Sequence, residues 1–253
     1  MHKSHLTCVE CHHESIKFDV FSCLSLPLPP MLGNSKVPLS SCFEEFISSE
    51  QLDTDNAWYC PRCKKHVCAK KRLNLWSTPD IFVLHLKRFG SARGDANSSK
   101  KSKRKSVYTC KINDVIDFPI DKLDLSKYVL MPGNKDDNIY KLIGVAEHQG
   151  RSANSGHYTA TVLNSKSPER QWHRYNDANV GVCTGDTAIS SGAYVLFYER
   201  INPSNKKSKT LKWAGMEKFM LNLKIDPRVE ESDSVDDDGF VQVKKVKKRS
   251  DRR

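Results

Sequence analysis

The sequence predicts an α+β fold in which an antiparallel sheet carries a smaller lobe built around a metal. Three observations support this prediction: short segments rich in aromatic and β-branched residues recur along the chain, two C-x-x-C pairs lie far apart in its first quarter, and apolar residues at helical spacing follow Ser41. With 253 residues, the chain is long enough for one sizeable core with a smaller lobe and tails.

The first predicted elements lie between the two cysteine pairs. From Ser15 to Leu28 apolar and polar residues alternate, which predicts a strand that ends at a pair of prolines. Ser41 then begins a predicted helix, because Ser41 and Glu44 match a reciprocal capping box. We expect the apolar face of this helix to pack on the sheet that follows.

The remaining predicted elements are strands. Asp80 to Phe89 contains four consecutive apolar residues, which suits a strand buried on both faces. Four later segments are short, aromatic or β-branched, and separated by Gly, Ser and Asn, so an antiparallel sheet is the economical interpretation. These segments are Tyr140 to Glu147, His157 to Leu163, Gln171 to Asn176 and Ala193 to Glu199.

The formal net charge of +11 is concentrated in two polar regions. The stretch from Gly90 to Ser106 is almost free of apolar residues, so it cannot offset the entropy of ordering, and we expect a basic disordered insertion at about residues 90 to 106. From Asn202 to Arg253 acidic and basic clusters replace the strand pattern, which predicts a charged, mostly disordered tail over 202 to 253.

Composition also indicates a compartment. No run approaches the ~20 apolar residues of a membrane-spanning helix, and the first residues lack the apolar core of a signal peptide. Nine cysteines without any sign of secretion favour reduced thiols and metal binding over disulfides. We expect the cytoplasm, the nucleus or both, with no membrane as a partner.

The two C-x-x-C pairs predict a structural zinc site. Each pair can present two thiolates from one tight turn to a tetrahedral Zn²⁺, and the long gap between the pairs requires strands that bring the two turns together. Reduced core cysteines, or one redox pair, are the alternatives. Nearby histidines and one more cysteine could act as substitute ligands. The predicted ligands are Cys8, Cys11, Cys60 and Cys63, and the substitutes are His12, His13, His66 and Cys68.

A second group of residues has the pattern of a nucleophile triad without its nucleophile. His157 begins a strand directly after glycine, and Asn176 and Asp177 follow about one strand later. Their side chains could orient the imidazole through its Nδ1–H, as the third member of a triad does. A histidine at a strand edge can equally be structural, so this group gains meaning only from its context.

In that context the chain resembles the ubiquitin-specific protease family over roughly residues 5 to 200, with the basic insertion as an interruption. The motifs that carry the resemblance occur in the family's order. They are Cys8 to Cys11, Leu24 to Pro27, Trp58 to Cys63, Ile81 to Phe89, Gly156 to Tyr158, Tyr175 to Asp177 and Ala193 to Tyr198.

The resemblance implies a papain-like cysteine protease of the ubiquitin-specific type, of which this chain supplies fingers and palm without the thumb. Residues 1 to 201 would form the C-terminal part of the catalytic domain, with fingers over about 1 to 75 and palm over about 76 to 201. By the same resemblance His157 is the general base, Asn176 orients it, Asp177 supports catalysis, and the four cysteines take the zinc positions at the fingertips.

One part of the family pattern is absent from the sequence. The family's nucleophilic cysteine lies in a box of approximately Asn-x-Gly-Asn-Thr-Cys, which also provides the oxyanion-hole donor, and nothing between Met1 and Thr7 resembles that box. Without nucleophile and oxyanion donor the covalent step is lost. We therefore expect a fragment or truncated gene product that is inactive alone.

The implied activity is deubiquitination, by hydrolysis of the bond after the C-terminal glycine of ubiquitin, with ubiquitin and ubiquitinated proteins as partners. One alternative is a catalytically inactive ubiquitin-binding or scaffold protein, which the coding sequence upstream of Met1 would distinguish. Another is a zinc-ribbon protein that binds nucleic acid through its basic residues. That alternative explains neither the strands nor the histidine motif, so we do not expect nucleic acid as a partner.

Overall fold

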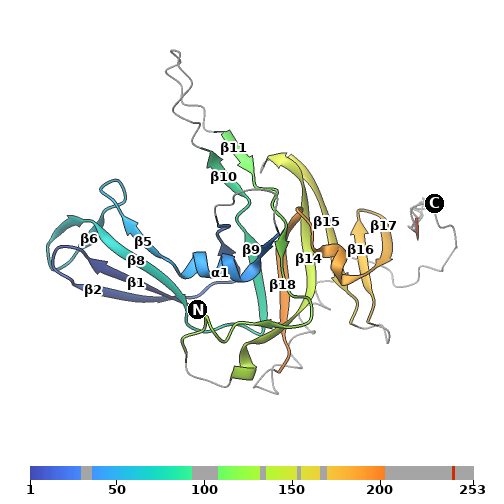
Figure 1. Cartoon of the computed structure of the whole chain (residues 1–253), viewed down its shortest axis with the longest axis horizontal. Coiled ribbons are helices and arrows are strands. Elements are labelled where there is room, and N and C mark those ends of the chain that lie inside the picture. The colour runs from blue at the N-terminus through green and yellow to red at the C-terminus, as the bar shows by residue number, and fades with distance from the viewer. Residues whose placement is uncertain are drawn as a thin grey trace, which may run out of the picture.

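The computed structural model describes residues 1–29, 36–92, 108–131, 135–152, 155–165, 170–202 and 241–242. Two sheets organise this part of the chain, and Figure 1 shows them at opposite ends of an elongated molecule. None of the helices within these ranges is both long and apolar enough to cross a membrane.

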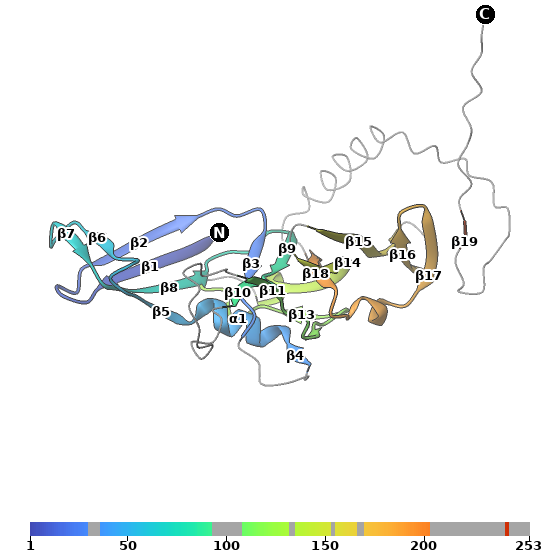
Figure 2. The same cartoon turned by 90° about the horizontal axis from the view of Figure 1, so that it is seen from above.

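The smaller sheet forms the projecting lobe, here called the fingers. Its strand order is β2-β1-β8-β5, and every neighbouring pair is antiparallel. A separate hairpin of β6 and β7 lies at its outer end (Figure 2). The bounds are β1 His2–Cys8, β2 Glu14–Asp19, β5 Ser49–Leu52, β6 Trp58–Cys60, β7 Lys65–Val67 and β8 Ala69–Leu75.

The larger sheet, here called the palm, has nine strands in the order β19-β17-β16-β15-β14-β18-β9-β3, with β13 paired to β14. All pairs are antiparallel except β3 with β9. The bounds are β3 Leu24–Leu26, β9 Ile81–Leu86, β13 Leu123–Asp124, β14 Ile139–Ser152, β15 Ser155–Leu163, β16 Trp172–Asn176, β17 Asn179–Cys183, β18 Ala193–Arg200 and β19 Val241–Gln242.

Smaller elements surround the palm. The helix α1 packs on one face of its sheet, β4 pairs with β12 in parallel, and β10 pairs with β11 in a hairpin. The bounds are α1 Leu39–Ile47, β4 Val37–Pro38, β10 Phe89–Ala92, β11 Tyr108–Lys111, β12 Ile116–Asp117, and the 3-10 turns η1 Lys135–Asn138 and η2 Gly185–Ala188.

The main core lies between α1 and the palm sheet. Alternate residues of β9 and β18 point into it, as the period of two in a strand requires, and Leu39, Cys42 and Phe43 of α1 close it from the other side. Burial of this apolar surface is the main force that holds the palm together. The predicted packing of the helix on the sheet is therefore confirmed.

Two predicted elements differ from the structure at their ends. The strand predicted from Ser15 to Leu28 is two strands, β2 in the fingers and β3 in the palm, so the alternation continues across a change of sheet. The predicted capping box of Ser41 and Glu44 is wrong: α1 begins at Leu39, and its N-cap, Pro38, makes no side-chain hydrogen bond. Proline suits this position because its fixed φ fits the entry to a helix and no donor is needed there.

The later strands follow the prediction closely, with one correction. β9 was expected to be buried on both faces, but Phe82, Leu84 and Leu86 are buried while Val83 and His85 are half-buried. One face of the palm sheet is thus covered by the core and the other is partly open. β17 was not predicted, because its short sequence with a central glycine has weak strand signals.

The charged regions fall mostly outside the described residues. Gly90 to Ala92 were expected to belong to the disordered insertion. They are instead part of β10 and pair with β11, so the ordered hairpin includes the first residues of that segment. Of the expected tail, Val241 and Gln242 pair with β17. Most of the other residues of the expected insertion and of the expected tail lie outside the described ranges.

Candidate functional site

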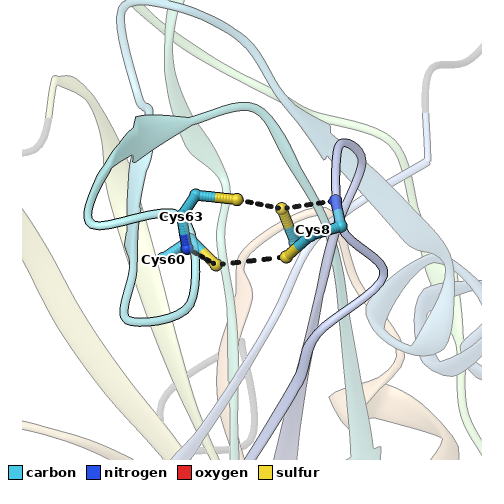
Figure 3. Close-up of side chains that lie close together, drawn as sticks. Cys8, Cys60 and Cys63 are labelled. Atoms are coloured by element: carbon cyan, nitrogen blue, oxygen red, sulfur yellow. Dashed lines mark hydrogen bonds between the residues drawn. The ribbon is translucent and has the colours of Figure 1, made fainter.

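The four cysteines of the two C-x-x-C pairs form one cluster at the outer end of the fingers. Their sulfur atoms all lie within 4.8 Å of one another. Cys8 Sγ lies 3.8 Å from Cys63 Sγ, and Cys11 Sγ lies 3.6 Å from Cys60 Sγ. Figure 3 shows the turn with Cys60 and Cys63 facing the turn with Cys8, so each turn contributes two sulfurs to a common centre.

This geometry fits a tetrahedral thiolate site. Four sulfurs at ~2.3 Å from one ion are ~3.8 Å apart, close to the two distances above. The backbone N–H of Cys11 donates to Cys8 Sγ at 3.4 Å, and that of Cys63 donates to Cys60 Sγ at 3.5 Å. The first of these bonds lowers the pKa of Cys8 to about 7, whereas the neighbouring thiol of Cys11 raises the pKa of Cys63 to about 12. Because neighbouring negative charges repel one another, a cation at the centre of the cluster would favour the thiolate form of all four cysteines.

The neighbours considered as substitute ligands are not part of this cluster. Within the described ranges, the group that could hold a metal contains the four cysteines alone. The ring of His13 stacks on Trp58, and the ring of His66 meets Tyr59 edge-on. These two histidines therefore pack against aromatic side chains beside the two C-x-x-C turns.

The second site is formed where β15 and β16 approach each other in the palm. His157 lies near the start of β15 and Asn176 is the last residue of β16. The antiparallel register pairs Ala160 with Tyr175, so Asn176 lies diagonally across from His157. His157 Nε2 lies 2.5 Å from Asn176 Oδ1, and 4.0 Å from Asp177 Oδ2. The structure thus brings together all three residues that the sequence predicted for this site.

The contact fixes which ring nitrogen of His157 carries a proton. The Asn176 Oδ1 atom can only accept, so Nε2–H must donate, and in the neutral ring Nδ1 keeps its lone pair. The sequence-based prediction that the ring is oriented through Nδ1–H is therefore wrong. Nδ1 makes no hydrogen bond with the described residues, and it is the atom able to take a proton from a thiol.

Asp177 takes its position from a tight turn. It has a φ of 51°, in the left-handed region, and the hairpin that pairs Asn176 with Asn179 needs such a residue. Aspartate tolerates this conformation better than most side chains. The Asp177 side chain is 82% exposed, so solvent screens most of its attraction for His157. Asn176 is accordingly the main partner of the ring.

Two glycines and a histidine shape the hairpin that carries His157. A Cβ on Gly156 would clash with the ring of His148, and one on Gly150 would clash with Ser155 O. His148 is buried under the hairpin, and its Nδ1 has no hydrogen-bond partner among the described residues. Burial lowers the pKa of His148, and nearby Lys111 adds to the effect. This ring therefore stays neutral and acts as packing.

Sequence reasoning also missed a buried carboxylate behind the site. The sequence patterns place Glu147 only at the end of the predicted strand Tyr140 to Glu147 and give it no role. It is buried, and it contacts residues of β15, β16 and the turn before β18. Only a sheet register could reveal these contacts, because the partners are distant in sequence.

None of the eight cysteines whose side chains the structure describes bonds to His157. Four are in the finger cluster, Cys42 is buried in α1, and the others described are Cys23, Cys68 and Cys183. Burial raises the pKa of Cys42 to about 11, so this thiol is a poor nucleophile. The two sites also lie far apart: β6 is near one end of the molecule and β16 is toward the other in both views (Figures 1 and 2).

The chain is similar to known proteins over most of its length. The family profile described as ubiquitin carboxyl-terminal hydrolase matches residues 1–198. Human ubiquitin carboxyl-terminal hydrolase 15 is 38% identical over 164 residues, which are 65% of this chain and 15% of that protein. Chicken ubiquitin carboxyl-terminal hydrolase 2 is 37% identical over 205 residues, which are 81% of this chain and 52% of that protein.

A solved structure is also similar. It is the SAGA Ubp8/Sgf11/Sus1/Sgf73 DUB module bound to ubiquitin aldehyde, with a TM-score of 0.58 and 29% identity over 79% of this chain and 41% of the matched chain. The chain thus spans about half or less of the length of these relatives. The predicted α+β fold of the ubiquitin-specific type is confirmed, and this chain belongs to the ubiquitin carboxyl-terminal hydrolase family.

Proposed function

We propose that this chain supplies the histidine side and the ubiquitin-binding fingers of a deubiquitinating thiol protease. The reaction is hydrolysis of the bond after the C-terminal glycine of ubiquitin. The observation that carries the proposal is the pairing of His157 Nε2 with Asn176 Oδ1, which leaves Nδ1 as a base, in a chain of this family.

The geometry gives each residue a role. His157 Nδ1 takes the proton of a cysteine thiol, and the thiolate attacks the carbonyl carbon to form an acyl-enzyme. The resulting imidazolium returns the proton to the leaving amine, and the same nitrogen then activates the water that releases ubiquitin. Asn176 accepts from Nε2–H throughout and holds the ring in one orientation. Asp177 lends a weaker, exposed negative charge.

The nucleophile is the missing part of this scheme. None of the cysteines whose side chains the structure describes bonds to His157, and none in the whole sequence has the family's Asn-x-Gly-Asn-Thr-Cys setting. We therefore expect these 253 residues to be inactive alone, with the thiol and the oxyanion donor supplied by other polypeptide. The same observation favours the second candidate function, a ubiquitin-binding protein without catalysis.

The cysteine cluster would hold Zn²⁺ with a structural role. Four thiolates complete a closed tetrahedral shell, which leaves no open position for water or substrate. Its two turns join β1 to β2 and β6 to β7, so the ion would tie together the outer ends of the fingers. Ubiquitin is the proposed partner of this lobe, in keeping with the ubiquitin-bound state of the similar DUB module.

A chimera tests the proposal. Residues 1 to 201 would replace the matching segment of the chicken relative, which brings its own nucleophile, and hydrolysis of a ubiquitin C-terminal amide reporter would be measured. We expect turnover, and we expect His157→Ala to lower it by at least ~10³-fold, in the range of general-base catalysis, with ubiquitin affinity unchanged. Binding without turnover in the parent chimera would favour the non-catalytic function.

The unmodified chain provides the complementary measurement. It should bind ubiquitin in a titration followed by NMR or calorimetry, and it should show no turnover of the reporter. Turnover that disappears when any one of its nine cysteines is replaced would overturn the expectation of inactivity and would identify the nucleophile.

A further inference from the structure

A buried carboxylate lies directly behind the strands that carry His157 and Asn176. The side chain of Glu147 on β14 is 3% exposed. Its Oε2 accepts from Thr159 Oγ1 at 3.0 Å and lies 3.5 Å from Arg174 Nη2, and its Oε1 accepts from Ser190 Oγ at 2.6 Å. One carboxylate therefore links β14 to β15, to β16 and to the turn before β18.

Two of the three partners of Glu147 lie on the same strands as His157 and Asn176, each two residues away from one of them. Thr159 is two residues after His157 on β15, and Arg174 is two residues before Asn176 on β16. Because side chains at a spacing of two share one face of a strand, each partner lies on the same face as the residue it flanks. Glu147 is directly opposite Thr159 in the β14–β15 register.

The pair of His157 and Asn176 needs such support. The His157 side chain is 44% exposed, so packing alone does not hold the ring. Its orientation depends on one hydrogen bond, and that bond depends on the relative position of β15 and β16. A buried carboxylate bonded to one strand and ion-paired with the other sets that position.

We propose that Glu147 is a positioning residue that keeps His157 in the tautomer with Nε2–H toward Asn176 and Nδ1 unprotonated. Glu147 acts through Thr159 and Arg174 and does not touch the reacting atoms. This inference deepens the proposed function and rests on its assignment of His157 as base. It also gives a reason for a carboxyl group paired with Arg174 to be buried here, since apolar residues of similar volume would often stabilise a core equally well.

Nuclear magnetic resonance of the ¹⁵N-labelled chain tests the proposal without any enzymatic activity. Long-range ¹⁵N–¹H spectra of the neutral ring report the two tautomers of His157, and a His157→Gln variant identifies its signals. In the parent chain we expect the Nε2–H form to dominate. In Glu147→Ala the ratio of the Nδ1–H form to the Nε2–H form should rise about tenfold, the effect of losing one well-placed hydrogen bond.

Milder variants keep the test informative if Glu147→Ala does not fold. Thr159→Val removes only the bond to β15, and should raise the ratio about threefold, since part of the hydrogen-bond network remains. Glu147→Gln keeps the size of the side chain and an acceptor oxygen, so it should preserve the parent ratio better than Glu147→Ala does. Rescue of this kind would not follow from a loss of stability alone.

Ser190→Ala is the matched control. It removes a hydrogen bond from the same carboxylate, but its partner is in the turn before β18 and not on β15 or β16. It should lower the melting temperature and leave the tautomer ratio unchanged. An unchanged ratio in Thr159→Val, with or without data on Glu147→Ala, or an equal shift in Ser190→Ala, would overturn the positioning role. Neither outcome depends on whether the chimera hydrolyses ubiquitin amides.

Discussion

The fingers and the palm are held together by different forces. In the palm, α1 and the sheet enclose a large apolar core that includes Phe82, Leu84 and Leu196, all fully buried. In the fingers, the buried cluster within the described ranges consists of Cys8, Cys60 and Val67. The finger strand β2 leaves Ile16 and Phe18 about half exposed, at 46% and 48%.

Strands with similar sequence patterns are therefore stabilised by different interactions in the two regions. A four-stranded sheet with one short row of buried groups cannot offset the entropy of ordering its strands by hydrophobic burial. A four-thiolate metal site can, because its binding free energy is available only to the folded lobe. We therefore expect the fingers to depend on metal and the palm to depend on its core.

Metal removal should produce the largest effect and should separate the two regions. Chelation, or Cys60→Ser, should unfold the fingers, because structural zinc in small domains contributes ~10 kcal/mol or more. Hydrogen exchange should show loss of protection in β1, β2, β6 and β8, with β14 and β18 still protected. Metal analysis should find one zinc per chain.

The matched control is Cys68→Ser, since Cys68 is a half-buried cysteine of the fingers that does not belong to the four-cysteine cluster. It should keep the metal and the protection of the fingers. Zinc that remains stoichiometric after both Cys60 and Cys63 are replaced by Ser would show that the four-cysteine assignment is wrong.

A cavity in the palm should have the next largest effect. Leu84→Ala truncates a fully buried side chain of β9 and should lower the free energy of unfolding of the palm by about 3 kcal/mol. Denaturant titration monitored by palm fluorescence or by hydrogen exchange would measure it. The metal content should not change. Loss of zinc from this variant would mean that the two regions unfold as one unit.

Alkaline pH should weaken the palm. Burial of the Tyr140 hydroxyl raises its pKa to about 12. The hydroxyl donates to Pro79 O at 2.7 Å. The unfolded chain ionises near pH 10, so this contribution is complete below pH 10 and is lost as pH rises toward 12, with a size of ~2 to 3 kcal/mol. Tyr140→Phe should reduce the slope of stability against pH in this range, whereas Tyr59→Phe, at a site 52% exposed in the fingers, should not.

A surface substitution in the fingers should have the smallest effect. Phe18→Ser on β2 removes an aromatic side chain that is about half exposed, so the free energy of unfolding should change by no more than about 0.5 to 1 kcal/mol. The same variant tests whether this exposed stripe takes part in binding, since ubiquitin affinity can be measured alongside. A destabilisation as large as that of Leu84→Ala would show that apolar packing also stabilises the fingers. That result would contradict the difference between the fingers and the palm.

The sequence by itself determined the local features of this protein. The C-x-x-C spacing places two sulfurs on one turn, and short runs of apolar, aromatic and β-branched residues identify β9, β14, β15, β16 and β18, because both signals are local in the chain. The residues of the candidate site, His157, Asn176 and Asp177, were also identified from the sequence, through the family resemblance of their motifs.

Only the tertiary structure decided what depends on partners distant in sequence. Whether an alternating strand is buried or exposed depends on the sheet it joins, which is why Ser15 to Leu28 divides between fingers and palm. The nitrogen of His157 that faces Asn176 depends on how β15 and β16 align. The contacts of Glu147 likewise require three strands to pair in one register, which brings together residues that are distant in sequence.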